Sequence, residues 1–352
     1  MSAAQRLGVL AAVMLLLLPS GAAGQSIDIG GFLTLEGEWH HNAGGPTRVW
    51  WEINRLRLDF SSQLSDHVSV LAEFAPVPEE ITHQIEELEL SDGRVLPIAD
   101  TATGVKEEQF SIPFERAEVR LQNLCGRWFN LSLGQLRDPF GHWEDFSSHR
   151  NATLTKNNTF VLGIALRNLD MGITADGDLT DWLDYRLGIR KGNNVATTDL
   201  GREDNNGRYD AVGRFGVHNG SSAVGFNAYF VDSRSDRFAL GADWQTSIAM
   251  LTLMGEGVLQ RNQPDGLRSL STYVQANFNL ARQVTGLRWF VLCDYWRLEA
   301  DSRLEREALS VDSGFKYKIP AGGLTLILEL GRTYVSAAPD PWHVTSQMEV
   351  EF

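Results

Sequence analysis

Apolar and polar residues alternate along almost the whole chain after residue 26. In one segment, Leu324, Leu326 and Leu328 alternate with Thr325 and Glu329. A period of two is typical of a β-strand whose two faces meet different surroundings. The pattern predicts about sixteen strands, of which the segment at 251–259 is the weakest. They lie at 27–39, 55–61, 68–74, 116–122, 129–134, 169–175, 183–190, 209–217, 224–230, 238–245, 251–259, 271–278, 287–295, 309–319, 324–330 and 344–352.

The connections between these segments alternate in length. Short turns rich in Gly, Asp, Asn or Pro lie at 65–67, 125–127, 176–181, 218–222 and 320–323. Longer connections lie between them, at 42–50, 75–112, 136–158, 192–206, 261–269, 299–307 and 335–342. Strict alternation puts all the short turns at one end of an antiparallel sheet. Outer-membrane barrels have this asymmetry.

The number of strands determines which face meets water. Sixteen tilted strands close into a cylinder about 30–35 Å across, which side chains cannot fill. Its interior must hold water and its apolar exterior must meet lipid, while closure pairs the backbone groups that an open edge would leave in hydrocarbon. A propeller would need an internal repeat of about 40 residues, which we do not find. We predict an all-β fold: a transmembrane antiparallel β-barrel with short periplasmic turns and long outer loops.

The first 24 residues have the three parts of a secretory signal. Arg6 precedes an apolar run at 7–18, and Pro19, Ser20 and a small-residue run at 21–24 follow. The apolar run is shorter than the roughly 20 residues that a membrane-spanning helix needs. A retained anchor is the alternative. We expect a cleaved signal peptide at 1–24, a barrel domain at 25–352, export through the periplasm and location in the outer membrane of a Gram-negative cell.

Composition narrows the function classes. The chain has 31 Lys and Arg against 45 Asp and Glu, a formal net charge of −14. This acidic balance argues against nucleic-acid binding, which relies on basic surfaces. Cys125 belongs to the turn after the fourth predicted strand and Cys293 to the thirteenth strand, too far apart for a disulfide, so both are expected to be free thiols, with Cys293 facing lipid.

No enzyme signature is present. The sequence has no P-loop, zinc-ligand spacing or nucleophile elbow, so neither catalytic activity nor a cofactor is expected. His40 and His41 are adjacent on a strand and point to opposite faces, which argues against a local metal site.

The face expected to line the interior carries many arginines. A ladder of such charges would draw anions through a pore. The alternative is that these arginines pair with inward acids at Asp59, Glu118, Asp170, Asp184, Asp210 and Asp294 and stiffen the wall. The ladder consists of Arg55, Arg57, Arg116, Arg120, Arg186, Arg190, Arg214 and Arg288, with Lys316 and Lys318 on the same face.

The connection at 75–112 is strongly acidic. The spacing of Ile81, Ile85 and Leu88 predicts a short amphipathic helix inside it. A solvated outer loop is the simpler interpretation. Docking of a partner or of a divalent cation is the other.

One stretch resembles a known family. Residues 134–141 read GQLRDPFG, similar to the G-Q-x-K-x-P-F-G segment of the phosphate-selective porin O and P family, and 167–173 and 182–189 resemble that family's next hairpin. The resemblance implies a sixteen-stranded porin, often a homotrimer, whose third long loop folds into the pore as a constriction. It makes Arg137, Asp138, Arg150 and Lys156 the candidate constriction residues. These residues lack the dense basic cluster that phosphate selectivity needs.

The final strand ends on Phe352. This ending resembles the C-terminal signal that the barrel assembly machinery reads in outer-membrane proteins.

Together these features predict a passive outer-membrane channel for small hydrophilic solutes or ions, with anions such as phosphate among the candidates. The expected partners are outer-membrane lipid, the assembly machinery, further copies in a homotrimer and the solutes themselves. The alternative is a structural sleeve around a partner such as a multihaem cytochrome.

Overall fold

The fold is taken from a computed structural model of the chain. It describes residues 27–41, 48–74, 82–89, 95–104, 114–137, 140–141, 169–190, 209–231, 237–262, 266–281, 284–300, 303–319, 323–335 and 342–351. The predicted signal peptide at 1–24, Asp138, Arg150, Lys156 and Phe352 lie outside these residues. The side chains of Arg55, Arg137 and Asp170 are not described, although the backbone strands that contain them are.

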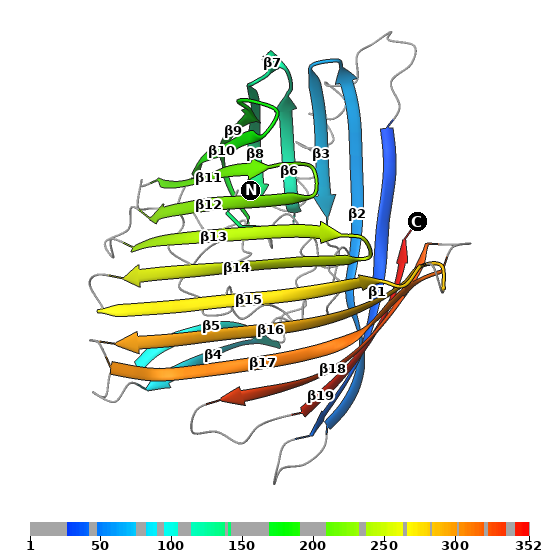
Figure 1. Cartoon of the computed structure of the whole chain (residues 1–352), viewed down its shortest axis with the longest axis vertical. Coiled ribbons are helices and arrows are strands. Elements are labelled where there is room, and N and C mark those ends of the chain that lie inside the picture. The colour runs from blue at the N-terminus through cyan, green and yellow to red at the C-terminus, as the bar shows by residue number, and fades with distance from the viewer. Residues whose placement is uncertain are drawn as a thin grey trace.

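Sixteen strands form one closed barrel (Figure 1). Each barrel strand pairs antiparallel with its neighbour, and β1 pairs with β19 to close the wall. The barrel strands are β1 (Ile27–His41), β2 (Arg48–Ser65), β3 (Val68–Phe74), β6 (Phe114–Leu121), β8 (Asn130–Arg137), β9 (Leu169–Asp178), β10 (Leu183–Arg190), β11 (Asp210–His218), β12 (Ser222–Val231), β13 (Arg237–Ile248), β14 (Leu251–Asn262), β15 (Leu267–Asn279), β16 (Leu287–Ala300), β17 (Arg303–Lys318), β18 (Leu324–Val335) and β19 (Trp342–Glu351).

The predicted fold class is confirmed, because each of the sixteen alternating segments overlaps one barrel strand. The weakest segment, at 251–259, is β14, which pairs along its whole length with both β13 and β15. Most strands continue past the residues that alternate clearly. Backbone hydrogen bonds to two neighbours therefore extend a strand beyond its side-chain pattern.

The helix predicted in the connection at 75–112 is wrong. The described part of this segment forms two strands, β4 (Thr82–Glu89) and β5 (Val95–Gly104), which pair with each other and not with the barrel. Between them the sequence contains Asp92-Gly93, a strong hairpin-turn signal. Pairing in a hairpin satisfies backbone groups over the full length of both strands, whereas an isolated helix this short is marginal in water.

The strict alternation of connection lengths is also wrong in the second half of the chain. The connection predicted at 299–307 shrinks to 301–302, because β16 runs to Ala300 and β17 begins at Arg303. The two strands extend through a register shift between Leu298 and Glu299. At the opposite end, the predicted turn at 125–127 lies within the four-residue strand β7 (Leu124–Arg127). The longest connections still share one end of the barrel.

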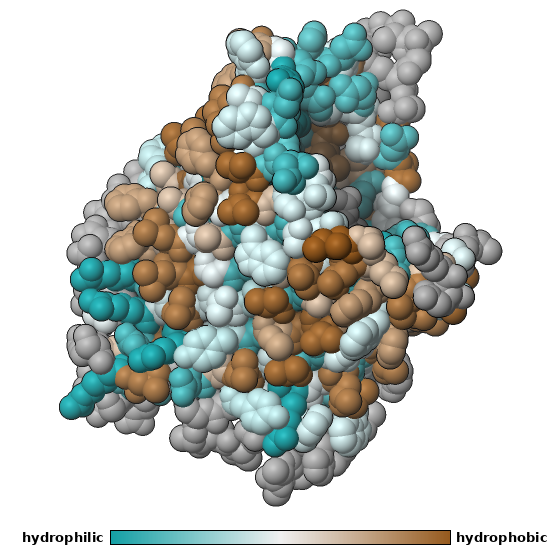
Figure 2. Space-filling model, viewed as in Figure 1, coloured by the Kyte–Doolittle hydropathy of each residue, from teal (hydrophilic) through white to brown (hydrophobic). Residues whose placement is uncertain are grey.

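The outer face of the wall is apolar. Large hydrophobic side chains alternate with the inward ones and stay exposed, and Figure 2 shows them gathered over β11 to β17. Representative members are Phe215, Phe226, Leu240, Leu259, Phe315 and Leu328. Cys125 and Cys293 are both free and exposed, as predicted. Among the described residues, no helix has the length and hydropathy to span a bilayer.

Candidate functional site: the inner wall of the barrel

The inner face carries the polar and charged residues. Along β11, Asp210, Val212 and Arg214 are buried while Phe215 and Val217 are exposed. The strand pleat produces this pattern because successive side chains point to opposite faces. The channel-facing surface is therefore made by every second residue of each strand.

Most of the predicted arginines with described side chains make close contacts with inner-wall partners. Arg120 Nη2 lies 2.6 Å from Asp176 Oδ2, and Arg57 Nε lies 2.7 Å from Asp59 Oδ1. Arg116 pairs with Glu118, which also accepts a hydrogen bond from the Ser132 hydroxyl. Arg190 is fully buried and donates to the Thr174 hydroxyl and to the carbonyl of Ile173.

Arg214 is at the centre of the largest described charge cluster. Its Nε and Nη2 donate to the two carboxylate oxygens of Asp243, at 3.0 and 2.8 Å, and its Nη1 donates to Asp184 at 3.3 Å. Asn227 also donates to Asp243, at 2.7 Å. A bidentate pair of this kind fixes both side chains. Strands β10 to β13 are thus joined by a polar network on their inner face.

Acids dominate the other half of the wall. Among the side chains that the structure describes from β13 to β19, six inner-face acids are 2% exposed or less, and the basic residues on the same face include Lys316, Lys318 and Arg288. In contrast, charge is nearly balanced among the described side chains from β2 to β11: six arginines (Arg57, Arg116, Arg120, Arg186, Arg190, Arg214) face seven acids (Asp59, Glu73, Glu118, Asp176, Asp178, Asp184, Asp210). The six acids of the acidic half are Asp243, Glu256, Asp294, Asp312, Glu329 and Glu349.

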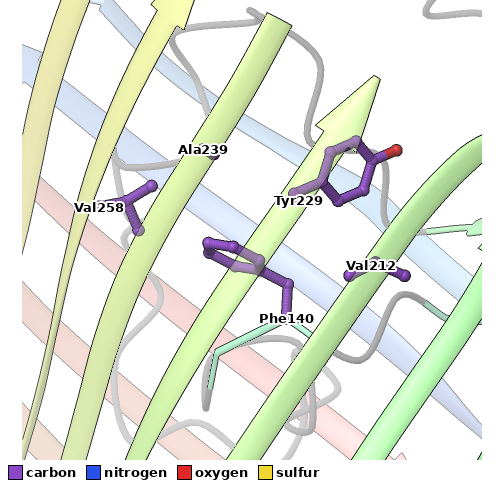
Figure 3. Close-up of a cluster of buried hydrophobic side chains, with 5 residues drawn as sticks. All are labelled: Phe140, Val212, Tyr229, Ala239 and Val258. Atoms are coloured by element: carbon purple, nitrogen blue, oxygen red, sulfur yellow. The ribbon is translucent and has the colours of Figure 1, made fainter. Parts of the chain in front are cut away.

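The chain after β8 returns to the inner wall. Phe140 is 1% exposed and packs against Val212, Tyr229, Ala239 and Val258, which belong to β11, β12, β13 and β14 (Figure 3). Its ring lies 6.5 Å from that of Tyr229 in an edge-on arrangement. A Cβ on Gly241 would come within 2.9 Å of the Phe140 ring, so this glycine leaves room for it.

Gly141 adds a polar contact beside the aromatic one. Its N–H donates to Asn227 Oδ1 at 2.9 Å, and the Glu256 carboxylate lies where a Cβ of residue 141 would be. Since β11 is three strands from β8 around the barrel, the chain must cross the inside of the wall to make these contacts.

The structure brings together some of the predicted residues. Arg214 joins the predicted acid Asp184, while Arg288 is exposed near the turn-bearing end of β16. Phe140 and Gly141 were not predicted as anchors, although both belong to the stretch that resembles the porin family. Asn227 and Asp243 are at polar positions of the alternating pattern, but that pattern did not identify them or Glu256 as site residues.

Not every inward residue is polar, contrary to the expectation from alternation. On β16, Phe290 and Leu292 are fully buried on the inner face. Phe290 packs with Ile327, and Leu292 packs with Met254 and Tyr273. This strand is apolar on both faces, so its alternation hides which residues point inward.

Comparison with solved structures supports the fold. The chain is similar to a loop L8 deletion mutant of OmpT, an outer membrane protein of Vibrio cholerae, with 12% identity, a TM-score of 0.63 and coverage of 94% of this chain and 100% of that chain. The outer membrane channel DcaP of Acinetobacter baumannii has 11% identity, a TM-score of 0.61 and coverage of 94% and 99%. An anion-selective porin from Comamonas acidovorans has 12% identity, a TM-score of 0.59 and coverage of 93% and 100%.

No model of a protein family matches the chain, and no curated protein matches it at a significant level. Membership of the phosphate-selective porin O and P family therefore stays a prediction. At 9–12% identity these structural similarities establish the fold alone, a closed sixteen-stranded barrel of the porin type.

Proposed function

We propose that the chain forms a water-filled channel for passive diffusion of small hydrophilic solutes across a bacterial outer membrane. One observation carries this proposal: a closed sixteen-stranded wall whose charged face points inward and whose apolar face points outward. Barrels of 16–18 strands are wide enough to leave an aqueous channel. An outer face of leucine and phenylalanine is stable only against lipid.

The segment after β8 is proposed as the constriction. The contacts of Phe140 and Gly141 with β11 to β14 support the prediction that the connection at 136–158 enters the channel. Arg137, Asp138, Arg150 and Lys156 remain the candidates for residues that meet the solute there.

The channel is proposed to prefer cations. Among the described side chains, the arginines from β2 to β11 are nearly balanced by acids, whereas β13 to β19 carry an excess of acids. Residues 138–168 do not reverse this excess, because Asp138, Glu144 and Asp145 balance Arg150, Lys156 and Arg167. Rings of carboxylates favour cations in a pore. We therefore propose that the arginines pair with acids and stiffen the wall, and not that they form a ladder that conducts anions.

A homotrimer and assembly through Phe352 are parts of the same proposal. A trimer form has been described for OmpT of Vibrio cholerae, a protein with a similar fold and 9% identity. The apolar outer wall would supply both the lipid contact and the contact between subunits.

Planar-bilayer recording tests the proposal. Purified protein added to a bilayer should give stepwise conductance increases, and in a potassium chloride gradient the reversal potential should have the sign of potassium permeation. Folded protein that gives no conductance steps would refute the channel. Steps with a reversal potential of the chloride sign would refute the cation preference while leaving the channel intact.

A further inference from the structure

Three potential metal ligands meet on the inner face of β17, β18 and β19. The Nε2 of His343 lies 3.1 Å from Asp312 Oδ1 and 3.8 Å from Glu329 Oε1. The three donor atoms all lie within 4.8 Å of one another. Among the described residues, these three are the His and carboxylate donors that lie close enough together to share one ion.

Strand register explains why they meet. Asp312 on β17 and His343 on β19 are both aligned with Gly331 on β18, one on each side of it. A Cβ at residue 331 would overlap both Asp312 Oδ1 and His343 Nε2, so their contact requires a glycine there. Glu329 is two residues before Gly331 and therefore points to the same face.

The buried Asp312 carboxylate has fewer polar partners than it can accept. The residue is 0% exposed; its Oδ1 contacts His343 Nε2, while its Oδ2 has no hydrogen-bond partner among the described residues. Its ion-pair contact is with His343. A buried carboxylate needs a counter-charge or hydrogen bonds to offset its desolvation. Two carboxylates beside one imidazole supply a negative charge that a divalent cation would neutralise.

The donor chemistry selects the cation. Imidazole nitrogen with carboxylate oxygen suits zinc and similar transition metals better than calcium or magnesium, which prefer all-oxygen sites. Donors bound to one zinc ion at about 2.1 Å in tetrahedral geometry lie about 3.4 Å apart. The observed separations of 3.1 and 3.8 Å bracket this value.

We propose that Asp312, Glu329 and His343 bind one zinc-like divalent cation on the inner wall of the barrel. His343 remains 14% exposed, so the ion has a route from the lumen. A bound ion would join three adjacent strands next to the β1–β19 closure. The proposal does not depend on conduction, and a protein that never forms channels would still bind the metal.

Equilibrium dialysis of the purified, detergent-folded full chain against Zn²⁺ tests it, with the metal measured by mass spectrometry. We expect one Zn²⁺ per chain. In Asp312→Asn and His343→Gln, which remove a direct ligand, affinity should fall by more than about 100-fold, since loss of a supporting outer-shell partner alone costs 10–100-fold. Gly331→Ala keeps all three ligands but fills the space between them, and should also lose the ion.

The matched control is His218→Gln. His218 Nε2 also faces a carboxylate, that of Asp184, at 3.8 Å, but among the residues that the structure describes no third donor joins them. This variant should bind Zn²⁺ like the unchanged protein. Equal binding in the control, Asp312→Asn and His343→Gln would overturn the proposal. A second measurement needs only the unchanged chain: Co²⁺ substituted for Zn²⁺ should show the strong visible bands of a low-symmetry site, and an unchanged chain that retains neither metal overturns the proposal even if a variant fails to fold.

Discussion

At the scale of single residues, Phe140 is the anchor of the proposed constriction. It contacts four strands at once, and Gly141 beside it donates to Asn227. The ring is buried as deeply as a core residue although it belongs to a connection. Its burial ties the position of this connection to the inner wall.

Phe140→Ala should widen the channel. In packed cores, Phe→Ala changes cost about 3–5 kcal/mol, enough to release a segment held by one side chain. Single-channel conductance should therefore rise and become noisier, while the barrel stays folded.

The control for this variant is Phe226→Ala. Phe226 is 62% exposed and belongs to the outer face of β12, so its loss should leave the conductance unchanged. Identical conductance in both variants and the unchanged protein would mean that Phe140 does not hold a constriction.

Residue pairings across strands were the part that the sequence could not predict. Alternation placed Arg214 and Asp184 on the inner face, but Asp243 is 29 residues from Arg214 and shares no motif with it. The same holds for Asp312, Glu329 and His343, which meet only through the register of β17, β18 and β19. Alternation excludes a slip of one residue, which would move every side chain to the other face, but a slip of two residues keeps the faces, so turn geometry and bulges decide which residues meet.

At the scale of elements, the alternating pattern predicted the barrel strands but not the structure of the segment at 75–112. Alternation identified all sixteen barrel strands because the wall has an apolar outer face and a mostly polar inner face. β4 and β5 pair with each other and are not strands of the barrel wall. Their short segments gave a helical spacing by chance, while the Asp92-Gly93 turn signal was the informative one.

Gly134 in β8 tests the local geometry of a strand. Its φ of 130° is unfavourable for other residues, and a Cβ would overlap the carbonyl oxygen of Ala117 on β6. Gly134→Ala should therefore destabilise the barrel, since a strained backbone costs of order 1–3 kcal/mol before the overlap is counted.

Urea unfolding followed by the heat-dependent gel shift of folded barrels measures this effect. Gly257→Ala on β14 is the control, because its nearest neighbour would be 3.7 Å from the new Cβ. Equal stability of the two variants would show that β6 and β8 do not pair as described.

At the scale of the whole molecule, closure and face polarity support each other. The closed barrel of sixteen strands leaves no open sheet edge. Its inner face carries acids and arginines, which require a polar interior. The inward apolar groups on β16 are local, since acidic or polar residues flank them on β15, β17 and β18. The central claim is therefore that the inner face meets water and the outer face meets lipid.

The most direct measurement uses two adjacent cysteines, Arg186→Cys and Leu187→Cys, after Cys125 and Cys293 are replaced by serine. Arg186 belongs to the inner face of β10, and Leu187 is 44% exposed on the outer face. A membrane-impermeant, positively charged methanethiosulfonate is added to single channels in a planar bilayer. If the inner face meets water, conductance should fall stepwise for Arg186→Cys and stay unchanged for Leu187→Cys. A fall for Leu187→Cys alone would contradict this assignment of the two faces.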